Sequence, residues 1–209
     1  FDHTRGFSEE VEYRLQPGQP ARPLFTLSDA LGTGHGWVTR FARVDGREYL
    51  QIRSTARSSP MVKLYVRQAD GAWRHCAEFG LAGRGKTPDD KSNRQWNQTF
   101  TGPRWEGRFG QSFCWVDRND DGQAQREEIE TIPGAFGACY WGQAMGEDLT
   151  VVIPQGNELV TVKPTGFTPG GAPLYSLATA TRFGAAVGGE GMLMVGHDGR
   201  TYVNHNPLR

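Results

Sequence analysis

The chain lacks an excess of charge of either sign, and it lacks any long hydrophobic run. Its 209 residues include 23 Lys and Arg against 23 Asp and Glu. A balanced charge argues against a general binder of nucleic acids or of membrane surfaces, because both are polyanions. Hydrophobic residues make up 37% of the chain, and no apolar stretch approaches the roughly 20 residues that span a bilayer. We therefore expect neither a nucleic-acid partner nor a membrane span.

Cysteines and catalytic motifs are also scarce. The three cysteines, Cys76, Cys114 and Cys139, show no CxxC or CxxCH spacing, which argues against zinc and c-type haem. One disulfide with a free thiol and three buried thiols are both open interpretations. The sequence has no HExxH metal motif and no GxSxG nucleophile elbow. Because no complete catalytic set can be named, we favour a protein that is not an enzyme.

Glycine and aromatic residues are plentiful instead. The chain has 28 glycines, and 11% of its residues are aromatic. With β-branched residues grouped between turns, this composition favours an all-β fold. The length suits one large domain or two small ones, and we interpret residues 1–209 as a single all-β domain. The start at Phe1 leaves two interpretations open, a removed leader peptide or a piece of a longer chain.

The strongest chemical signal lies between residues 117 and 128. Oxygen-bearing side chains stand at positions 1, 3 and 5 of this twelve-residue stretch (Asp117, Asn119, Asp121), a glycine at position 6 (Gly122) and a glutamate at position 12 (Glu128). Alternate residues of a tight loop point inward, and a hard dication takes six to eight such oxygens. This stretch resembles the calcium loop of EF-hand proteins.

The remaining positions of the loop complete the predicted oxygen set. Gln123 at position 7 would supply its backbone carbonyl, and Gln125 at position 9 would bind directly or through a water. The sequence therefore predicts a Ca²⁺ site formed by Asp117, Asn119, Asp121, Gln123 and Glu128.

The surroundings of the loop differ from a paired EF-hand. Residues 111–116 read as a strand rather than an entering helix, and residues 126–132 leave room for at most two helical turns before Pro133-Gly134. We therefore expect a strand, a loop and a short helix, with a structural rather than a switching role for the metal. The alternative is a hairpin turn rich in Asp, Asn and Gly that binds no metal.

Alternating strands dominate the first half of the chain. Residues 37–44 and 47–53 flank Asp45-Gly46, which is a strong hairpin signal, and two more strands follow at 62–67 and 73–79. Residues 33–80 thus predict a four-stranded antiparallel meander. The pattern Asp-Gly-Arg-x-Tyr-aliphatic at Asp45 returns at Asp198, 153 residues later (198 − 45). That spacing is about three repeats of a propeller blade, so we expect a β-propeller-like array of four-stranded meanders, or alternatively an open β-sandwich.

A long polar segment covers residues 80–110. It reads as a loop, and loops of this length in compact domains tend to be functional. Trp96 and Trp105 lie in it, and sugars stack on exposed aromatic faces, so these two are candidates for glycan binding. The alternative is that they fill gaps between blades.

Several motifs occur in an order that resembles a known family. These are the strand around Tyr49, residues 62–66, the turn Asp70-Gly71-x-Trp73, the loop with its preceding Trp115-Val116, and a Pro/Gly-rich run from Val162 to Tyr175. Together they resemble the large NHL-like propeller proteins of secreting bacteria, in which a calcium loop is inserted between blades. The resemblance spans residues 40–205, with the calcium loop as its specific motif. It implies a propeller fold and a metal rather than a chemistry. The chain is long enough for about four blades, fewer than a closed propeller of this kind. Two interpretations are therefore open, a part of a longer propeller or an open β-sandwich.

These observations lead to one functional hypothesis and one alternative. We expect a calcium-stabilised, secreted or periplasmic module that presents loops to a glycan or protein partner, since calcium is plentiful outside the cytoplasm. The alternative is a carbohydrate-active enzyme, a lyase or hydrolase, with its site in a propeller channel. Two carboxylates about 5–10 Å apart in one cleft would favour the hydrolase.

Overall fold

The regular structure of the protein is mostly antiparallel β-sheet. A computed structural model describes residues 10–33, 38–54, 61–85, 87–90, 94–134, 136, 145–184 and 192–204. Within these ranges the strands form four sheets, of which the largest has six strands. The prediction of an all-β fold is confirmed.

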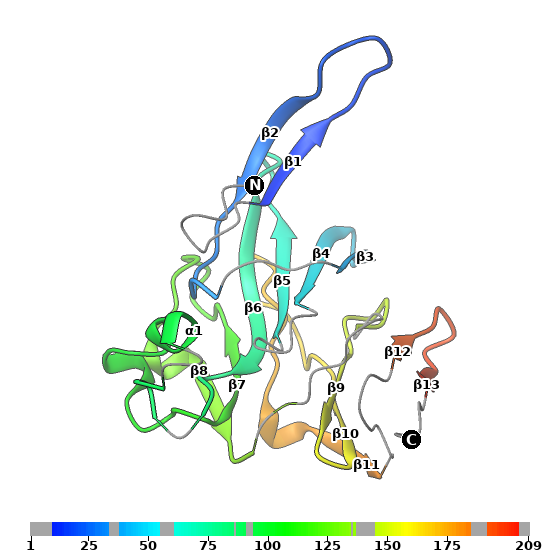
Figure 1. Ribbon diagram of the computed structural model, residues 1–209. Coiled ribbons are helices and arrows are strands. Elements are labelled where there is room, and N and C mark those ends of the chain that lie inside the picture. The colour runs from blue at the N-terminus through cyan, green and yellow to red at the C-terminus, as the bar shows by residue number, and fades with distance from the viewer. Residues whose placement is uncertain are drawn as a thin grey trace.

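The central sheet is an uninterrupted meander. Its six strands pair in sequence order, β3-β4-β5-β6-β7-β8, and every pairing is antiparallel (Figure 1). The first four strands form the meander predicted for residues 33–80. The strands are β3 (Val38–Val44), β4 (Arg47–Ser54), β5 (Met61–Arg67), β6 (Trp73–Leu81), β7 (Ser112–Val116) and β8 (Ile129–Ile132).

The turn between β3 and β4 forms for the reason that the sequence suggests. Asp45 and Gly46 have φ angles of 50° and 77°, and a two-residue turn with both φ values positive matches the right-handed twist of the flanking strands. This turn places Val44 opposite Arg47.

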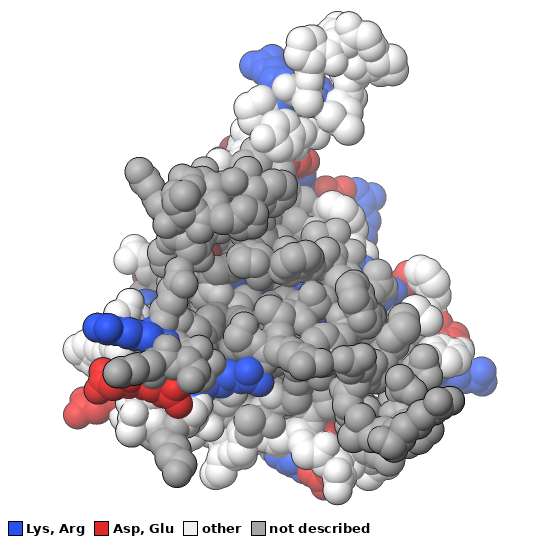
Figure 2. All heavy atoms as spheres, in the orientation of Figure 1, with Lys and Arg blue, Asp and Glu red and all other residues white. Residues whose placement is uncertain are grey.

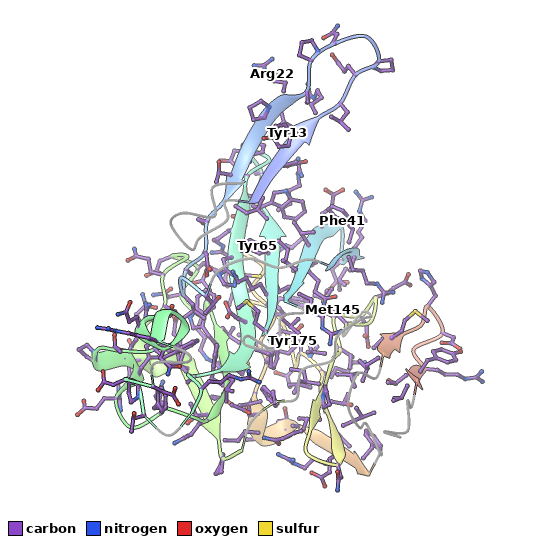
Figure 3. All side chains as sticks on the ribbon, in the orientation of Figure 1. Tyr13, Arg22, Phe41, Tyr65, Met145 and Tyr175 are labelled. Atoms are coloured by element: carbon purple, nitrogen blue, oxygen red, sulfur yellow. The ribbon has the colours of Figure 1, made fainter. Side chains whose placement is uncertain are left out.

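Three smaller sheets surround the central one. The first has the order β11-β10-β9, and the others are the hairpins β1–β2 and β12–β13. The β1–β2 hairpin projects from the body and carries Tyr13 and Arg22, whereas Tyr65 and Tyr175 point inward (Figures 1 and 3). The strands are β1 (Glu10–Arg14), β2 (Arg22–Leu27), β9 (Val151–Gln155), β10 (Glu158–Val162), β11 (Thr181–Gly184), β12 (Met192–Val195) and β13 (Thr201–Asn204).

Both faces of the middle strands of the central sheet are buried. One face contributes side chains such as Val66 and Phe79 to a core shared with β9, β10 and Tyr175. The other face carries Phe113, which packs against the segment that follows β6. Six consecutive residues of β5 are buried as a result, which explains why this strand is apolar on both sides.

The topology does not show the four-stranded blades of a propeller. The sheet continues through β7 and β8 after the first four strands. The two Asp-Gly turns of the apparent repeat do each join neighbouring antiparallel strands, β3 to β4 and β12 to β13. Both copies of the pattern therefore lie at hairpins, and this does not establish a repeated blade.

The segment predicted as a long loop carries structure of its own. β6 extends to Leu81, and α1 (Arg94–Thr99) and η3 (Pro103–Trp105) follow it. Trp105 is only 2% exposed, and its ring packs edge-on against Phe100 and Phe113 with centroids 4.9 and 5.0 Å away. Trp105 is therefore a core residue without a free face for a sugar. The side chain of Trp96 lies outside the described residues.

Two of the three cysteines can be placed. Cys76 and Cys114 are buried free thiols on β6 and β7, and burial raises the pKa of both. Their burial and high pKa make them unreactive at neutral pH. Cys139 lies outside the described residues.

The surface matches the balanced composition. In the described part of the face drawn in Figure 2, basic and acidic side chains lie next to one another without a continuous field of one sign. No helix among the described residues has the length and apolar character needed to cross a membrane.

The burial of Trp105 makes a prediction about stability. Trp105→Ala should lower the free energy of unfolding by about 3–5 kcal/mol, because it leaves a cavity between Phe100 and Phe113. Trp105→Phe should lower the free energy of unfolding by less, since the indole Nε1 has no hydrogen-bond partner among the described residues. Urea unfolding measures both. Phe183→Ala, at an exposed aromatic, is the control and should change the value by less than about 0.5 kcal/mol; an equal loss in both alanine variants would contradict the assignment.

Candidate metal centre

The predicted calcium loop is the connection of a β-hairpin. Residues 117–128 join β7 to β8, whose last pair before the loop is Trp115 opposite Ile129. The expected short helix is one 3₁₀ turn, η4 (Arg126–Glu128), and β8 begins at the next residue. The strand and the loop appear where they were predicted. Residues 129–132, which the sequence allowed to be helical, are instead a strand because their pairing with β7 completes the sheet.

Asp117 forms the centre of the loop. Its carboxylate is fully buried, and Oδ1 and Oδ2 accept hydrogen bonds from the backbone N–H groups of Asp121 and Gly122, at 3.0 and 3.1 Å. Gly122 has a φ of 69°, a left-handed conformation in which glycine is favoured. The chain thus wraps around the first predicted ligand.

The middle of the loop is a network of side-chain oxygens and amides. Asn119 Oδ1 accepts from Asp121 N at 3.2 Å, and Asp121 Oδ1 accepts from Gln123 N at 2.7 Å. Asp121 Oδ2 accepts from the amide groups of Asn119 and Gln125, at 3.0 and 2.7 Å. Asn119, Asp121 and Gln123 are exposed. Four loop positions are therefore already connected around one carboxylate.

Glu128 closes the loop from its far end. Its Oε1 accepts from Arg118 N at 2.8 Å, and its Oε2 accepts from the indole of Trp115 at 3.0 Å and from Gln125 N at 3.3 Å. The side chain is 4% exposed. Glu128 is the third residue of the η4 turn, where a carboxylate that caps the free N–H groups is stabilising. The side chain of Glu128, at position 12, thus contacts the backbone of Arg118, at position 2.

The donor set fits a hard cation in two respects. All its side-chain donors are oxygens, which Ca²⁺ prefers. Gln125 Oε1, at loop position 9, is buried and has no hydrogen-bond partner among the described residues, although buried acceptors are normally satisfied. The N–H groups of Asn119 and Gln125 now compensate the charge of Asp121, which a bound cation would do in their place.

The guanidinium of Arg74 lies against the carboxylates of the loop. Arg74 Nη1 is 3.3 Å from Asp117 Oδ2, and Nη2 is 2.7 Å from Asp120 Oδ1. Burial raises the pKa of Asp117, and Arg74 offsets only part of this effect. Burial would also raise the pKa of Asp120, but hydrogen bonds from Thr168 and Arg74 outweigh it and hold this pKa below its usual range.

Asp120 ties the loop to a second segment. Its Oδ1 accepts from Thr168 Oγ1 at 2.5 Å and its Oδ2 accepts from Gly170 N at 2.8 Å. A Cβ at Gly170 would lie only 2.5 Å from Asp120 Cγ, so glycine is required for this contact. Sequence reasoning missed this role because position 4 carries no ligand and its partners lie about 50 residues away.

A second polar cluster lies on the opposite face of β6. Asp29, His75 and Glu78 each offer a ligand atom, and these atoms all lie within 4.8 Å of one another. By distance alone they could hold a metal. No sequence motif pointed to this group, although Glu78 opposite Lys63 in a buried sheet is an unusual charged pair.

The hydrogen bonds of this cluster favour a network without a metal. His75 Nδ1 accepts from Ala30 N at 3.1 Å, so a neutral ring carries its proton on Nε2 and offers no lone pair to a metal. Asp29 pairs with Lys63 at 2.7 Å, and Glu78 Oε2 accepts from Thr33 at 3.0 Å. We interpret the cluster as buried polar support for the sheet.

Burial governs the protonation of this cluster. It raises the pKa of Glu78 to about 8, and the negative charge of Asp29 adds to this shift. It also lowers the pKa of His75 to about 3, although Asp29 acts in the opposite direction. At neutral pH the cluster therefore contains the Lys63–Asp29 ion pair beside an uncharged His75 and a protonated Glu78.

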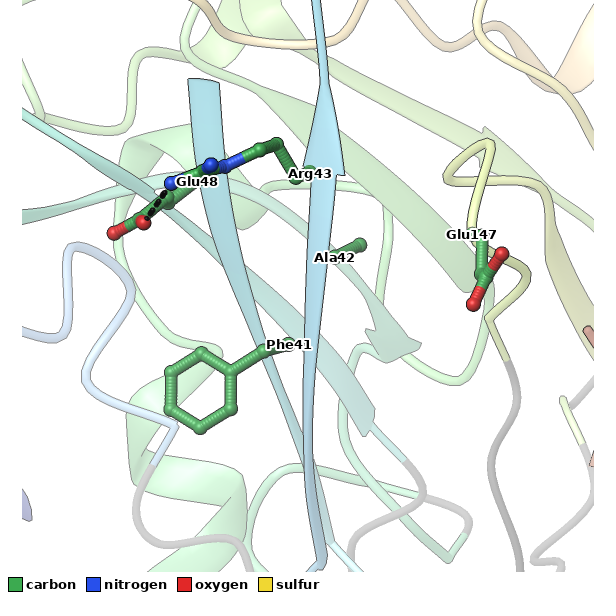
Figure 4. A pocket seen from close by; sticks show the side chains of 5 residues that line it. All are labelled: Phe41, Ala42, Arg43, Glu48 and Glu147. Atoms are coloured by element: carbon green, nitrogen blue, oxygen red, sulfur yellow. Dashed lines mark hydrogen bonds and ion pairs between the residues drawn. The ribbon is translucent and has the colours of Figure 1, made fainter. Parts of the chain in front are cut away.

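A pocket of about 520 Å³ lies at the edge strand β3. It is lined by Phe41, Ala42, Arg43, Glu48 and Glu147. Figure 4 shows the Arg43–Glu48 ion pair on one side of β3 and Glu147 on the other. Both carboxylates already have partners, since Glu147 also contacts the His197 ring.

The anchoring role of Asp120 can be tested by substitution. Asp120→Ala should cost about 2–4 kcal/mol of unfolding free energy, because it removes two charge-assisted hydrogen bonds and leaves Arg74 with one fewer partner. Urea unfolding in the presence of a chelator measures the loss. Asp198→Ala is a matched control in an exposed turn, where Asp198 also bonds two groups, and it should cost less than about 1 kcal/mol. A similar small loss in both variants would argue against the anchor.

The protonated Glu78 predicts a pH dependence. Its folded pKa of about 8 lies above its ordinary value of 4.5, so between these values the folded state keeps a proton that the unfolded state releases. Stability should therefore fall as pH rises through this window. The groups that face Glu78 are Asp29, Lys63, His75 and Arg104.

Glu78→Gln should remove this pH dependence. Its melting temperature should rise relative to the unsubstituted protein as pH increases from 5 to about 8, measured in chelator. Glu106→Gln, at an exposed glutamate, should follow the unsubstituted protein at every pH. A constant difference between Glu78→Gln and the unsubstituted protein would show that Glu78 is ionised throughout.

Comparison with known proteins adds no relative to this picture. No protein-family model, no curated protein and no solved structure matches the chain. Its function must be argued from its own residues.

Proposed function

We propose that residues 117–128 bind Ca²⁺ and that the ion stabilises an extracytoplasmic module that presents loops to a glycan or protein partner. The observation that carries the proposal is a loop that contains the buried carboxylates of Asp117 and Glu128 and the buried Gln125 Oε1, which has no hydrogen-bond partner among the described residues. N–H donors reach each carboxylate oxygen of Asp117 and Glu128, and a hard dication would use the lone pairs that these donors leave.

Each predicted ligand has a defined part in the proposal. Asp117, Asn119 and Asp121 would supply side-chain oxygens, Gln123 its backbone carbonyl and Glu128 two carboxylate oxygens. The bound ion would act as a crosslink that holds the ends of the loop together. A cation that binds only the folded state at a hundredfold excess over its dissociation constant adds about 2.7 kcal/mol of stability.

A binding role is favoured over catalysis. Both carboxylates in the pocket at β3 are already paired, with Arg43 or His197, which does not favour a hydrolase acid–base pair. Trp105 is part of the core. Of the two tryptophans predicted to contact a glycan, Trp96 therefore stays the candidate. A secreted or periplasmic location is part of the proposal, because calcium is abundant there.

Thermal unfolding with calcium and with a chelator tests the metal site. Calcium should raise the melting temperature by several degrees, since each kcal/mol shifts a domain of this size by about 2–4 °C. Asp117→Asn and Asp121→Asn should abolish the rise. Terbium bound at the loop should also luminesce when tryptophan is excited, because the Trp115 indole contacts Glu128 at 3.0 Å.

Asp70→Asn is a matched control for these variants. Asp70 Oδ1 accepts from the N–H group two residues ahead, as Asp121 does, and it lies in an exposed turn of another hairpin. This variant should keep the full calcium response. An identical melting temperature with calcium and with chelator, together with no terbium signal, would reduce the loop to a hairpin turn.

A further inference from the structure

Arg74 lies between the calcium loop and the 168–172 segment. From its position at the start of β6 it contacts Asp117 and Asp120, and its Nη2 also donates to the carbonyl of Gly170 at 3.0 Å. Its side chain is only 14% exposed. The guanidinium is thus held against the first predicted metal ligand in a site that is largely shielded from water.

We infer that Arg74 is a built-in cation that holds the loop together in the absence of calcium and lowers its calcium affinity. This inference rests on the proposed function and identifies a residue that tunes the same site. Asp117 would have two cationic partners, a permanent one at Nη1 and an exchangeable one in the loop. Because like charges repel, the permanent cation weakens binding of the second.

The other arginines of this region are engaged elsewhere. Arg118 pairs with Glu130 at 3.0 Å, and Arg126 donates to the carbonyls of Pro103 and Glu106. Among the described residues, Arg74 is therefore the arginine placed to compensate Asp117. Its stem also contacts the turn, since a Cβ at Gly122 would lie 3.5 Å from Arg74 Cγ.

The inference has two consequences of opposite sign. Without calcium, loss of the guanidinium leaves a buried carboxylate uncompensated and should destabilise the fold. With calcium, the same loss removes a repulsion from the ion and should tighten binding. A weak site filled only at the millimolar calcium levels found outside cells is the natural result of retaining Arg74.

Calcium titration of neutral and charged variants tests the inference. Arg74→Gln and Arg74→Met should bind calcium about tenfold more tightly, since a unit charge a few ångströms from a dication contributes that much even at the dielectric constant of water. Both should melt lower than the unsubstituted protein in chelator and show a larger calcium-induced rise. Arg74→Lys, which keeps the charge, should retain the original affinity.

Arg47→Gln is the matched control. Arg47 donates to the carbonyls of Thr168 and Pro169, at 3.3 and 2.8 Å, so it stabilises the same segment that Arg74 reaches. If stabilisation of this segment were the cause, Arg47→Gln would change calcium affinity as well. We expect its dissociation constant to be unchanged.

The outcomes separate the inference from the proposed function. Unchanged or weaker calcium binding by both neutral variants overturns the inference while the calcium site stands. Failure of both to fold in saturating calcium also overturns it, because calcium should replace the guanidinium. If the unsubstituted protein and every variant show neither a calcium-dependent melting temperature nor a terbium signal, it is the proposed function that fails.

Discussion

The structure depends on the burial of β6 between two layers. Alternate residues of this strand point to opposite faces of the sheet, so Arg74 meets the 117–128 loop and His75 meets Asp29 on the far side. Charged groups on such a strand must be paired, because an isolated buried charge costs several kcal/mol. The two polar clusters are therefore consequences of one strand that has no solvent face. Each contacts a segment brought from elsewhere in the chain.

The 117–128 loop and the β6 cluster solve this problem differently. In the loop, backbone N–H groups and side-chain amides surround the carboxylates. In the cluster, one ion pair remains and burial keeps Glu78 protonated and His75 neutral. The first solution leaves oxygen lone pairs that a cation can use. In the second, the N–H of Ala30 occupies the Nδ1 lone pair of His75, and burial keeps a proton on Glu78. That difference, rather than the distances between the groups, makes the loop the better metal candidate.

Sequence alone was sufficient for the features that depend on local pattern. Alternation and the Asp45-Gly46 turn predicted the meander, and the spacing of oxygens from Asp117 to Glu128 predicted a wrapped loop. It could not predict that β7 and β8 extend the same sheet, because that choice depends on packing rather than on spacing. The Asp120–Gly170 and Asp29–His75 contacts join residues 46–50 positions apart, and no local signal reports them. For Trp105 the sequence left a glycan contact and a gap-filling role open, because a polar segment hides its core position.

The position of Asp120 gives the loop an influence beyond its own residues. Asp120 holds Thr168 and Gly170, and Thr168 also lines a pocket of about 250 Å³ with Asp45, Arg47 and Phe167. Asp120, at position 4 of the loop, would not bind the ion, so its carboxylate can hold the Thr168 side of this pocket. A metal that fixes positions 3 and 5 must also fix position 4 between them. Calcium would then order a surface that it does not touch, which is how a structural ion can matter to a binding protein.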